Sequence, residues 1–347
     1  MEAASIPESP AARPRRPFGS LVADNILWLL LGLALVVYFI QDPKQTLDDV
    51  KTGLSNGTIW ALIALGYTLV YGIIELINFA HGEVFMVGAF GGLAIYRWVL
   101  PESWQEQWYI ALPLMLLGGV IVAVVIAVLM ERFAYRPLRN APRLAPLITA
   151  LGVSVALQEA IRLWFPDADA AQPFPRVFVD KQIDLGPIEI SASGLLLIVV
   201  SIGLSILLQA YVSQSRMGRA MRATSQDRDT ARLMGVNPDR VIVLTFVLGA
   251  ALAGVAGVLY GSYITNVDNS IGFQNGIFAF TAAVLGGIGS LRGAVIGAFI
   301  IGLIKTLGGQ YLPGGTQYDY VWIFVVLILV LVFRPQGLFG DVERVRA

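Results

Sequence analysis

The chain has 347 residues, of which 56% are hydrophobic and 14% are charged, and its mean hydropathy is +0.70. A water-soluble domain carries roughly 25% charged residues, so this composition indicates an integral membrane protein. There is no cysteine and only one histidine, His81, which excludes disulfides, thiol catalysis and most histidine-based metal sites. The sequence has no G-x-x-x-x-G-K-[ST] motif, so any ATP-driven work requires another chain.

The order of polar and apolar segments predicts three parts. Residues 1–24 are polar and form a cytoplasmic extension, residues 25–340 form a single transmembrane domain, and residues 341–347 form a cytoplasmic tail. The apolar segments are 25–40, 53–74, 84–98, 110–130, 144–165, 194–212, 241–262, 276–289, 293–310 and 320–333. They predict an all-α polytopic membrane protein with about 8–10 transmembrane helices.

Two of these segments are short for a membrane span. A spanning helix needs about 20 residues. Segments 84–98 and 276–289 fall below that length and are rich in glycine. We therefore expect discontinuous helices near 75–98 and 276–293, which are tolerated where they pack against protein or line a cavity.

The distribution of arginines predicts the orientation. With a cytoplasmic N-terminus, the loop 131–143, the segment 213–240 and the C-terminal tail fall inside and carry many arginines. The loops 101–109 and 166–193 then fall outside and are acidic. This pattern follows the positive-inside rule and places both termini in the cytoplasm.

The longest polar interruption, 213–240, carries six arginines and reads as two short helices. Its first half has an apolar stripe at helical spacing that includes Met217 and Met221. Asp227 is positioned to cap a second helix that ends at Gly235. Capped helices with apolar side chains indicate a docking hairpin. The alternative is a basic loop that only sets membrane orientation.

A second polar group occupies 67–83, between two apolar segments. Its members with ionisable or polar side chains are Tyr67, Tyr71, Glu75, Asn78, His81 and Glu83. Ionisable groups at membrane depth normally face protein interior or water. We expect either a broken helix that lines a solute path or a cytoplasm-facing turn that ties two helices together. The lone histidine has no partnered nucleophile, which argues against an enzyme site.

The glycine-rich segment 281–294 includes Thr281 and Gly287. Its glycines do not fit G-x-G-x-x-G and no strand precedes them, so a dinucleotide site is excluded. Small residues allow helices to approach closely and to break.

Four motifs together resemble one known family. They are Asn78-Phe79-Ala80-His81-Gly82-Glu83, the hairpin sequence Ala231-x-x-Met234-Gly235-Val236-Asn237-x-Asp239-Arg240-Val241, the run Phe280–Ser290, and Arg334-Pro335-x-Gly337-Leu338-Phe339-Gly340. In this order, from about residue 52 to 340, they resemble the membrane permease subunits of bacterial branched-chain amino acid ABC importers. Urea and short-chain amide importer permeases are close relatives.

The resemblance implies a non-catalytic, multi-pass subunit of the bacterial inner membrane. Its partners would be a homologous permease (or a second copy), two cytoplasmic ATP-binding subunits and a periplasmic solute-binding protein, with no nucleic acid involved. No cofactor would belong to this chain, because ATP and Mg²⁺ sit on the ATPases. The hairpin would be the coupling element, through Met217, Arg219, Met221, Arg222, Asp227, Arg228, Met234 and Gly235. Candidate path residues are Tyr67, Tyr71, Glu75, Asn78, His81, Glu83, Thr281 and Gly287.

Two other interpretations stay open at this point. The solute is a branched-chain or other neutral amino acid, or else urea or a short-chain amide. A protein of another class, a stand-alone channel or ion-coupled carrier, would need a coupling site at the membrane midplane. Glu75 and Glu83 are the candidates for such a site, and the chain would then transport without ATPase subunits.

Overall fold

A computed structural model describes residues 32–33, 35–139, 141–142, 144–176, 182–184, 189–311, 315–334 and 336–340. The expected extension 1–24, the tail 341–347 and half or more of the first apolar segment lie outside these residues. The chain divides into a unit that ends at Thr46 and one that begins at Leu47. In the first, residues 35–41 are helical. The following description concerns the second.

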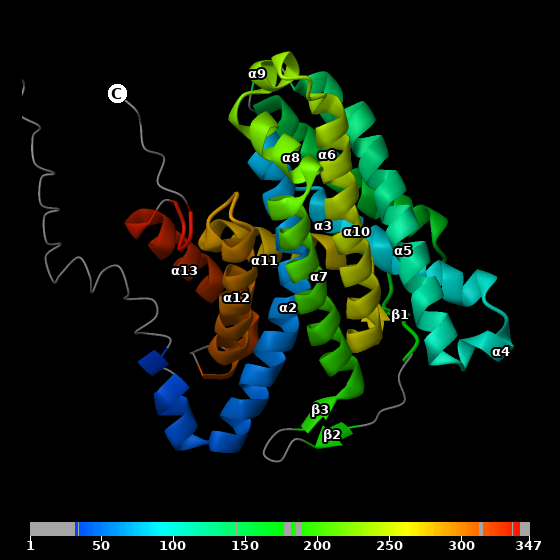
Figure 1. The fold of residues 1–347 in the computed structure, drawn as a ribbon. Helices are drawn as coiled ribbons and strands as arrows, with labels where there is room; N and C mark the ends of the chain where they lie inside the picture. Colours follow the sequence, from blue (N-terminus) through cyan, green and yellow to red (C-terminus); the bar gives the residue numbers. More distant parts are fainter. Residues whose placement is uncertain are drawn as a thin grey trace, which may run out of the picture. The chain divides into compact units, whose positions relative to one another are not determined.

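Helices dominate the described chain (Figure 1). The helices of the candidate membrane spans are α2 (Pro43–Ile74), α5 (Trp108–Met130), α6 (Leu144–Trp164), α7 (Ala192–Gln214), α10 (Pro238–Ile264), α12 (Leu291–Tyr311) and α13 (Asp319–Phe333). The other helices are α3 (His81–Ala94), α4 (Glu102–Gln105), α8 (Arg216–Gln226), α9 (Arg228–Leu233) and α11 (Ile271–Gly286). Single π- or 3₁₀-turns are η1 (Ile95–Val99), η2 (Glu131–Tyr135), η3 (Arg136–Leu138) and η4 (Gly315–Tyr318).

Two small antiparallel pairs join loops at one end of the bundle. Strand β1 (Gln172–Pro173) pairs with β4 (Asn266–Val267), and β2 (Gln182–Asp184) pairs with β3 (Glu189–Ser191). The fold is therefore all-α in its membrane part, as the sequence predicts.

Among the described residues, seven helices are long and apolar enough to cross a membrane. They differ in how far the protein itself covers them. The apolar stretch of α2 is 89% buried, whereas those of α6 and α13 are each 17% buried. Helices α6 and α13 therefore present apolar side chains outward, toward lipid or another chain.

The centre of the bundle is built from helices that meet at backbone distance. A Cβ atom added to Gly88 of α3 would lie 2.6 Å from the Cα of Gly254 on α10. One added to Gly254 would lie 2.9 Å from the carbonyl oxygen of Gly119 on α5. Real Cβ contacts are longer than this, so only glycine fits at these crossings. We call α2, α3, α10 and α11 the packed centre.

Helix α3 begins inside the bundle, not at its surface. The His81 ring packs edge-on against Tyr67 of α2, with 5.0 Å between ring centroids. Tyr67 lies about 10 Å before the end of α2, at 1.5 Å per residue. Glu75, at φ 60°, ends α2 in a left-handed conformation, and the chain then folds back beside the helix. Helix α3 is thus one of the two short helices expected from the sequence.

Helix α11 is the other short helix. It ends at Gly286, after which Gly287 takes a φ of 104°. Its close partner is the start of α12, because a Cβ added to Gly286 would lie 1.9 Å from the carbonyl oxygen of Gly293. The expectation that small residues in 281–294 permit close helix approach and a helix break is confirmed.

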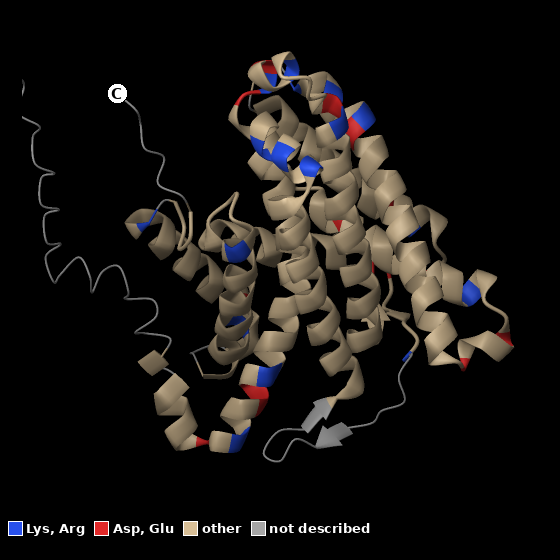
Figure 2. Cartoon of the chain, in the orientation of Figure 1, with Lys and Arg blue, Asp and Glu red and all other residues tan. Residues whose placement is uncertain are grey.

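The loops separate into two ends. Arg136 and Arg139 contact Asp239, and Arg228 contacts the end of α2, so η3, the hairpin and the start of α10 share one end. Figure 2 shows arginines gathered there, and we call it the hairpin end. At the opposite end, Arg97 donates to Gln172 of β1. The arginine-rich loops thus lie at one end, and the loops 101–109 and 166–176 lie at the other.

Candidate functional site

The hairpin helices α8 and α9 are held by local side-chain caps. Ser215 accepts a hydrogen bond from the backbone N–H of Gly218 at 2.9 Å. Asp227 accepts from the backbone N–H of Asp229 at 2.8 Å and of Thr230 at 3.1 Å. The hydrogen bonds from Thr230 lower the pKa of the Asp227 carboxyl. With Gly235 at φ 83°, the cap and stop predicted from the sequence are confirmed.

The apolar stripe of α8 faces this chain's own bundle. Met221 is 2% exposed and Thr224 is 1% exposed. The expectation that Met221 inserts into a partner therefore needs correction, because α8 packs against α7 and α10 of this chain. The apolar side chains that protrude from the hairpin are Leu233 at 87% and Met234 at 80% exposure. Met217 is half-buried.

The arginines of the hairpin contact backbone carbonyls of neighbouring helices. Arg222 donates to the carbonyl oxygens of Val212 and Ser213 at the end of α7. Arg228 donates to the carbonyl oxygen of Ile74, the last residue of α2, at 2.8 Å. The hairpin is thus attached directly to the segment 75–80 that leads into α3.

An ion-pair network fixes the base of the hairpin. Arg139 bonds both Glu131 and Asp239, and Arg136 bonds Asp239 at 3.2 Å. Glu131 is 1% exposed, so its charge is compensated within the protein. Beside this network lies a polar cavity of about 360 Å³ that Arg228 of α9 also lines.

The polar group expected at 67–83 is largely buried. Glu83 accepts hydrogen bonds from Ser154 at 2.9 Å and Gln158 at 2.8 Å, both on α6. Asn78 accepts one from the Tyr135 hydroxyl at 2.6 Å. These bonds tie α3 and its leading segment to neighbouring helices, which is the tying role considered from the sequence.

A small void lies among these residues. The cavity between Tyr67, Tyr71 and Asn78 is about 10 Å³, room for about one water molecule at most. Thr281 is buried, and Gly287 packs against the segment 336–340. Of the remaining candidates, Glu75 is exposed at the hairpin end. This conformation offers no passage through the small cavity.

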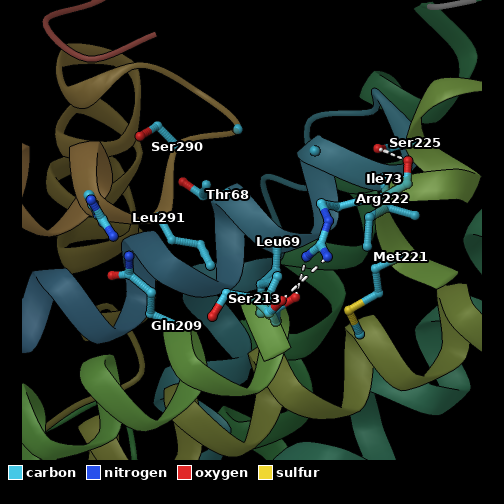
Figure 3. A pocket seen from close by; sticks show the side chains of 14 residues that line it. Thr68, Leu69, Ile73, Gln209, Ser213, Met221, Arg222, Ser225, Ser290 and Leu291 are labelled. Carbon is cyan, nitrogen blue, oxygen red and sulfur yellow. Dashed lines mark hydrogen bonds between the residues drawn. The ribbon is translucent and has the colours of Figure 1, made fainter. Parts of the chain in front are cut away.

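A second cavity at the hairpin end lies between α2, α7, α8 and the turn before α12 (Figure 3). Its volume is about 330 Å³. The lining residues are Thr68, Leu69, Gly72, Ile73, Gln209, Val212, Ser213, Met221, Arg222, Ser225, Gly289, Ser290, Leu291 and Arg292. We call it the arginine cavity, after Arg222 and Arg292. Sequence reasoning missed this cavity, because four separate segments of the chain form it.

Sequence reasoning also missed a lysine held among aromatic rings. The Lys305 ammonium lies 4.7 Å from the Phe278 ring centroid and 5.3 Å from that of Trp60. Asp319 is buried nearby, at the start of α13. A lysine inside the apolar segment 293–310 was a visible signal, since ionisable residues at membrane depth mark functional positions.

These features define an all-α polytopic membrane protein with an arginine-rich helical hairpin at one end. In the described part of the chain, no three His, Asp or Glu side chains gather as a metal site. Residues 50–331 match the family model described as the permease component of branched-chain amino acid transport systems. The chain belongs to that family.

Three curated relatives illustrate the similarity. The high-affinity branched-chain amino acid transport system permease protein BraD of Pseudomonas aeruginosa is 43% identical over 310 residues, which cover 86% of this chain and 98% of the relative. The permease protein LivH of Escherichia coli K12 is 42% identical over 307 residues, covering 86% and 97%. The permease protein LivM of the same strain is 29% identical over 123 residues, covering 35% and 28%.

Proposed function

We propose that this chain is the transmembrane subunit of an ATP-driven importer of branched-chain amino acids. The observation that carries the proposal is the 42–43% identity to BraD and LivH over almost their whole length. Both relatives are named as permeases of high-affinity branched-chain amino acid transport. The chain itself would form the path, and ATP with Mg²⁺ would be used on partner subunits.

The proposed partners are a second permease, two ATP-binding subunits and a periplasmic solute-binding protein. A related permease is supported by the partial match to LivM, which the same E. coli strain has beside LivH. Helices with outward apolar faces, such as α13, offer surface for a second permease or lipid. The arginines at the hairpin end support a cytoplasmic hairpin in the bacterial inner membrane.

The hairpin is the proposed ATPase contact. Its exposed tip, Leu233 and Met234, supplies apolar side chains that a cleft on the ATPase would cover. The rim arginines Arg219 and Arg232 would steer association more than they add affinity. Movement of the tip would pass through Arg228 to the end of α2. No chemistry would be performed by this chain.

Uptake in proteoliposomes tests the function. With all partner subunits, the binding protein and ATP, radiolabelled leucine or isoleucine should accumulate, and withholding ATP should stop it. Accumulation of urea or a short-chain amide in place of leucine would replace the proposed solute. Transport by this chain alone would instead support a channel or ion-coupled carrier and overturn the proposal.

Co-purification tests the docking surface. Met234→Asp places a charge in the apolar tip, which should reduce co-purification of the ATPases about tenfold or more, the equivalent of about 1.4 kcal/mol. Gln226→Glu adds the same charge to the exposed end of α8, away from the tip, and is the matched control. Equal recovery of ATPases with both variants would place the docking surface elsewhere.

A further inference from the structure

The arginine cavity has an unusual charge balance. Its lining includes the guanidinium groups of Arg222 and Arg292 and no aspartate or glutamate. Figure 3 shows Arg222 at this hollow, with dashed lines for its hydrogen bonds. Both arginines are exposed, and two cations without an acidic neighbour in the lining attract an anion. The cavity therefore suits a ligand with a negative group.

Both guanidinium groups are held in place but keep free donors. Arg222 is oriented by the carbonyl oxygens of Val212 and Ser213. Arg292 lies beside the Gln209 amide, whose oxygen, with the amide group turned over, accepts from Nε and Nη2 of Arg292. Within the described chain, these bonds use two of the five N–H groups that each guanidinium carries. The others can bind a carboxylate, for which the guanidinium fork is well matched.

The rest of the lining combines apolar side chains with hydroxyl groups, which a simple anion does not require. Leu69, Ile73 and Leu291 form an apolar wall. Thr68 is 1% exposed and its hydroxyl oxygen has no hydrogen-bond partner among the described residues. Buried polar groups are normally satisfied, so this hydroxyl calls for a partner. Ser213 on the facing helix adds a hydroxyl that can accept from an ammonium.

The size of the cavity limits the ligand. A volume of about 330 Å³ stands at the lower end of the roughly 300–1,000 Å³ that small-molecule pockets span. We infer that the arginine cavity binds a free aliphatic amino acid, with its carboxylate on Arg222 and Arg292 and its side chain on the apolar wall. This inference rests on the proposed function, because it takes the imported solute as the ligand.

The position of the cavity gives the site a role. Arg222 belongs to α8 of the hairpin and Arg292 to the start of α12, so a bound carboxylate bridges the two. Bridging holds the hairpin in its present position. Amino acid that has accumulated on the hairpin side then slows further import, and the site senses the product of transport.

Binding to the purified complex, without the periplasmic protein, tests the site. Labelled leucine is titrated by equilibrium dialysis with unlabelled competitors. Its keto acid, 4-methyl-2-oxopentanoate, should compete because it keeps the carboxylate and the side chain, whereas leucinamide should not. Competition by acetate at the same concentration as leucine would show a general anion site and overturn the assignment to an amino acid.

Two variants locate the binding. Arg292→Ala should weaken leucine binding at least tenfold, and the near-isosteric Thr68→Val should weaken it several-fold. Arg240→Ala removes an exposed arginine at the same end and outside the cavity, and should leave binding unchanged. Co-purified ATPases show that each variant is folded. If Arg292→Ala and Thr68→Val bind leucine like the unaltered complex, the cavity is not the site.

Transport separates this inference from the proposed function. Leucine placed on the hairpin side should slow uptake by the unaltered complex several-fold and should have little effect on Arg292→Ala. ATP-driven leucine uptake without saturable leucine binding, or with equal inhibition of both complexes, would overturn the site and leave the proposed function intact. Absence of ATP-driven leucine uptake would overturn the proposed function itself.

Discussion

The packed centre and the α8–α9 hairpin are stabilised in different ways. In the centre, segments distant in sequence meet at backbone distance, as Gly88 and Gly254 do. In the hairpin, Ser215 and Asp227 satisfy backbone groups two or three residues away. Long-range packing responds to any change of volume, whereas local capping travels with its helix. The centre therefore depends on contacts between distant segments, and the hairpin helices depend on contacts within the hairpin.

Overpacking the centre should have the largest effect. Gly254→Leu forces a side chain into the carbonyl oxygen of Gly119 and should cost well over the about 1–3 kcal/mol of ordinary overpacking, because backbone cannot yield as a side chain does. Gly203→Leu on α7, where nothing lies within 4 Å, is the matched control. The measurement is the yield and thermal midpoint of monodisperse protein in detergent. Equal stability of both variants would contradict the glycine crossing.

Removing one buried hydrogen bond should have a moderate effect. Tyr135→Phe deletes the hydroxyl that donates to Asn78 and leaves a buried amide oxygen without its donor. The expected cost is about 1–3 kcal/mol of stability. Tyr109→Phe, at an exposed hydroxyl, should cost far less.

Thermal unfolding in detergent compares these two variants. If both lose the same stability, Asn78 has found another partner, and the bond does not tie η2 to the segment before α3.

Arg228 connects the hairpin to the end of α2. Its removal should therefore impair the coupling of ATP hydrolysis to transport while leaving the protein folded. Arg228→Ala frees the carbonyl oxygen of Ile74 and should cost about 1 kcal/mol locally. We expect faster hydrogen exchange at 75–80 and more ATP hydrolysed per solute imported. Arg240→Ala removes an exposed arginine at the same end that is not part of the proposed docking surface, and serves as control. Identical behaviour of the two variants would remove Arg228 from the transmission route.

The sequence predicted the helices better than it predicted which helices pack against each other. Apolar runs predicted the long helices to within a few residues at most ends. Asp227 and Gly235 predicted the bounds of the second hairpin helix. Both predictions succeed because helix formation and capping depend on residues that are neighbours in sequence. The short helices followed from length and glycine content. The roles assigned to the candidate site residues stay predictions.

What the sequence could not supply were contacts across the fold. Ser154 and Gln158 reach Glu83 from a helix some seventy residues away in sequence. An apolar stripe predicts that one face of a helix is buried, but it does not predict which part of the protein or which partner buries it. The sequence predicted that Met221 contacts the ATPase, whereas its side chain is buried within this chain.

The smallest expected effect concerns the Asp227 cap. Hydrogen bonds from Thr230 lower the pKa of this carboxyl in the folded protein below its ordinary value of 3.8. A depressed pKa means that the cap stabilises α9 fully above the unfolded value and that this stabilisation is lost as the pH falls through the folded pKa. Hydrogen-exchange protection at Asp229 and Thr230 should therefore stay constant above about pH 5 and fall as the pH drops below the ordinary pKa.

Asp227→Asn separates capping from titration, because asparagine also caps a helix but carries no proton in this range. The variant should keep protection at Thr230 that does not change with pH, while protection in the packed centre stays the same in both proteins. A pH dependence that persists in Asp227→Asn would assign it to another group. Global unfolding over the same range would mean that the hairpin is not an independent unit.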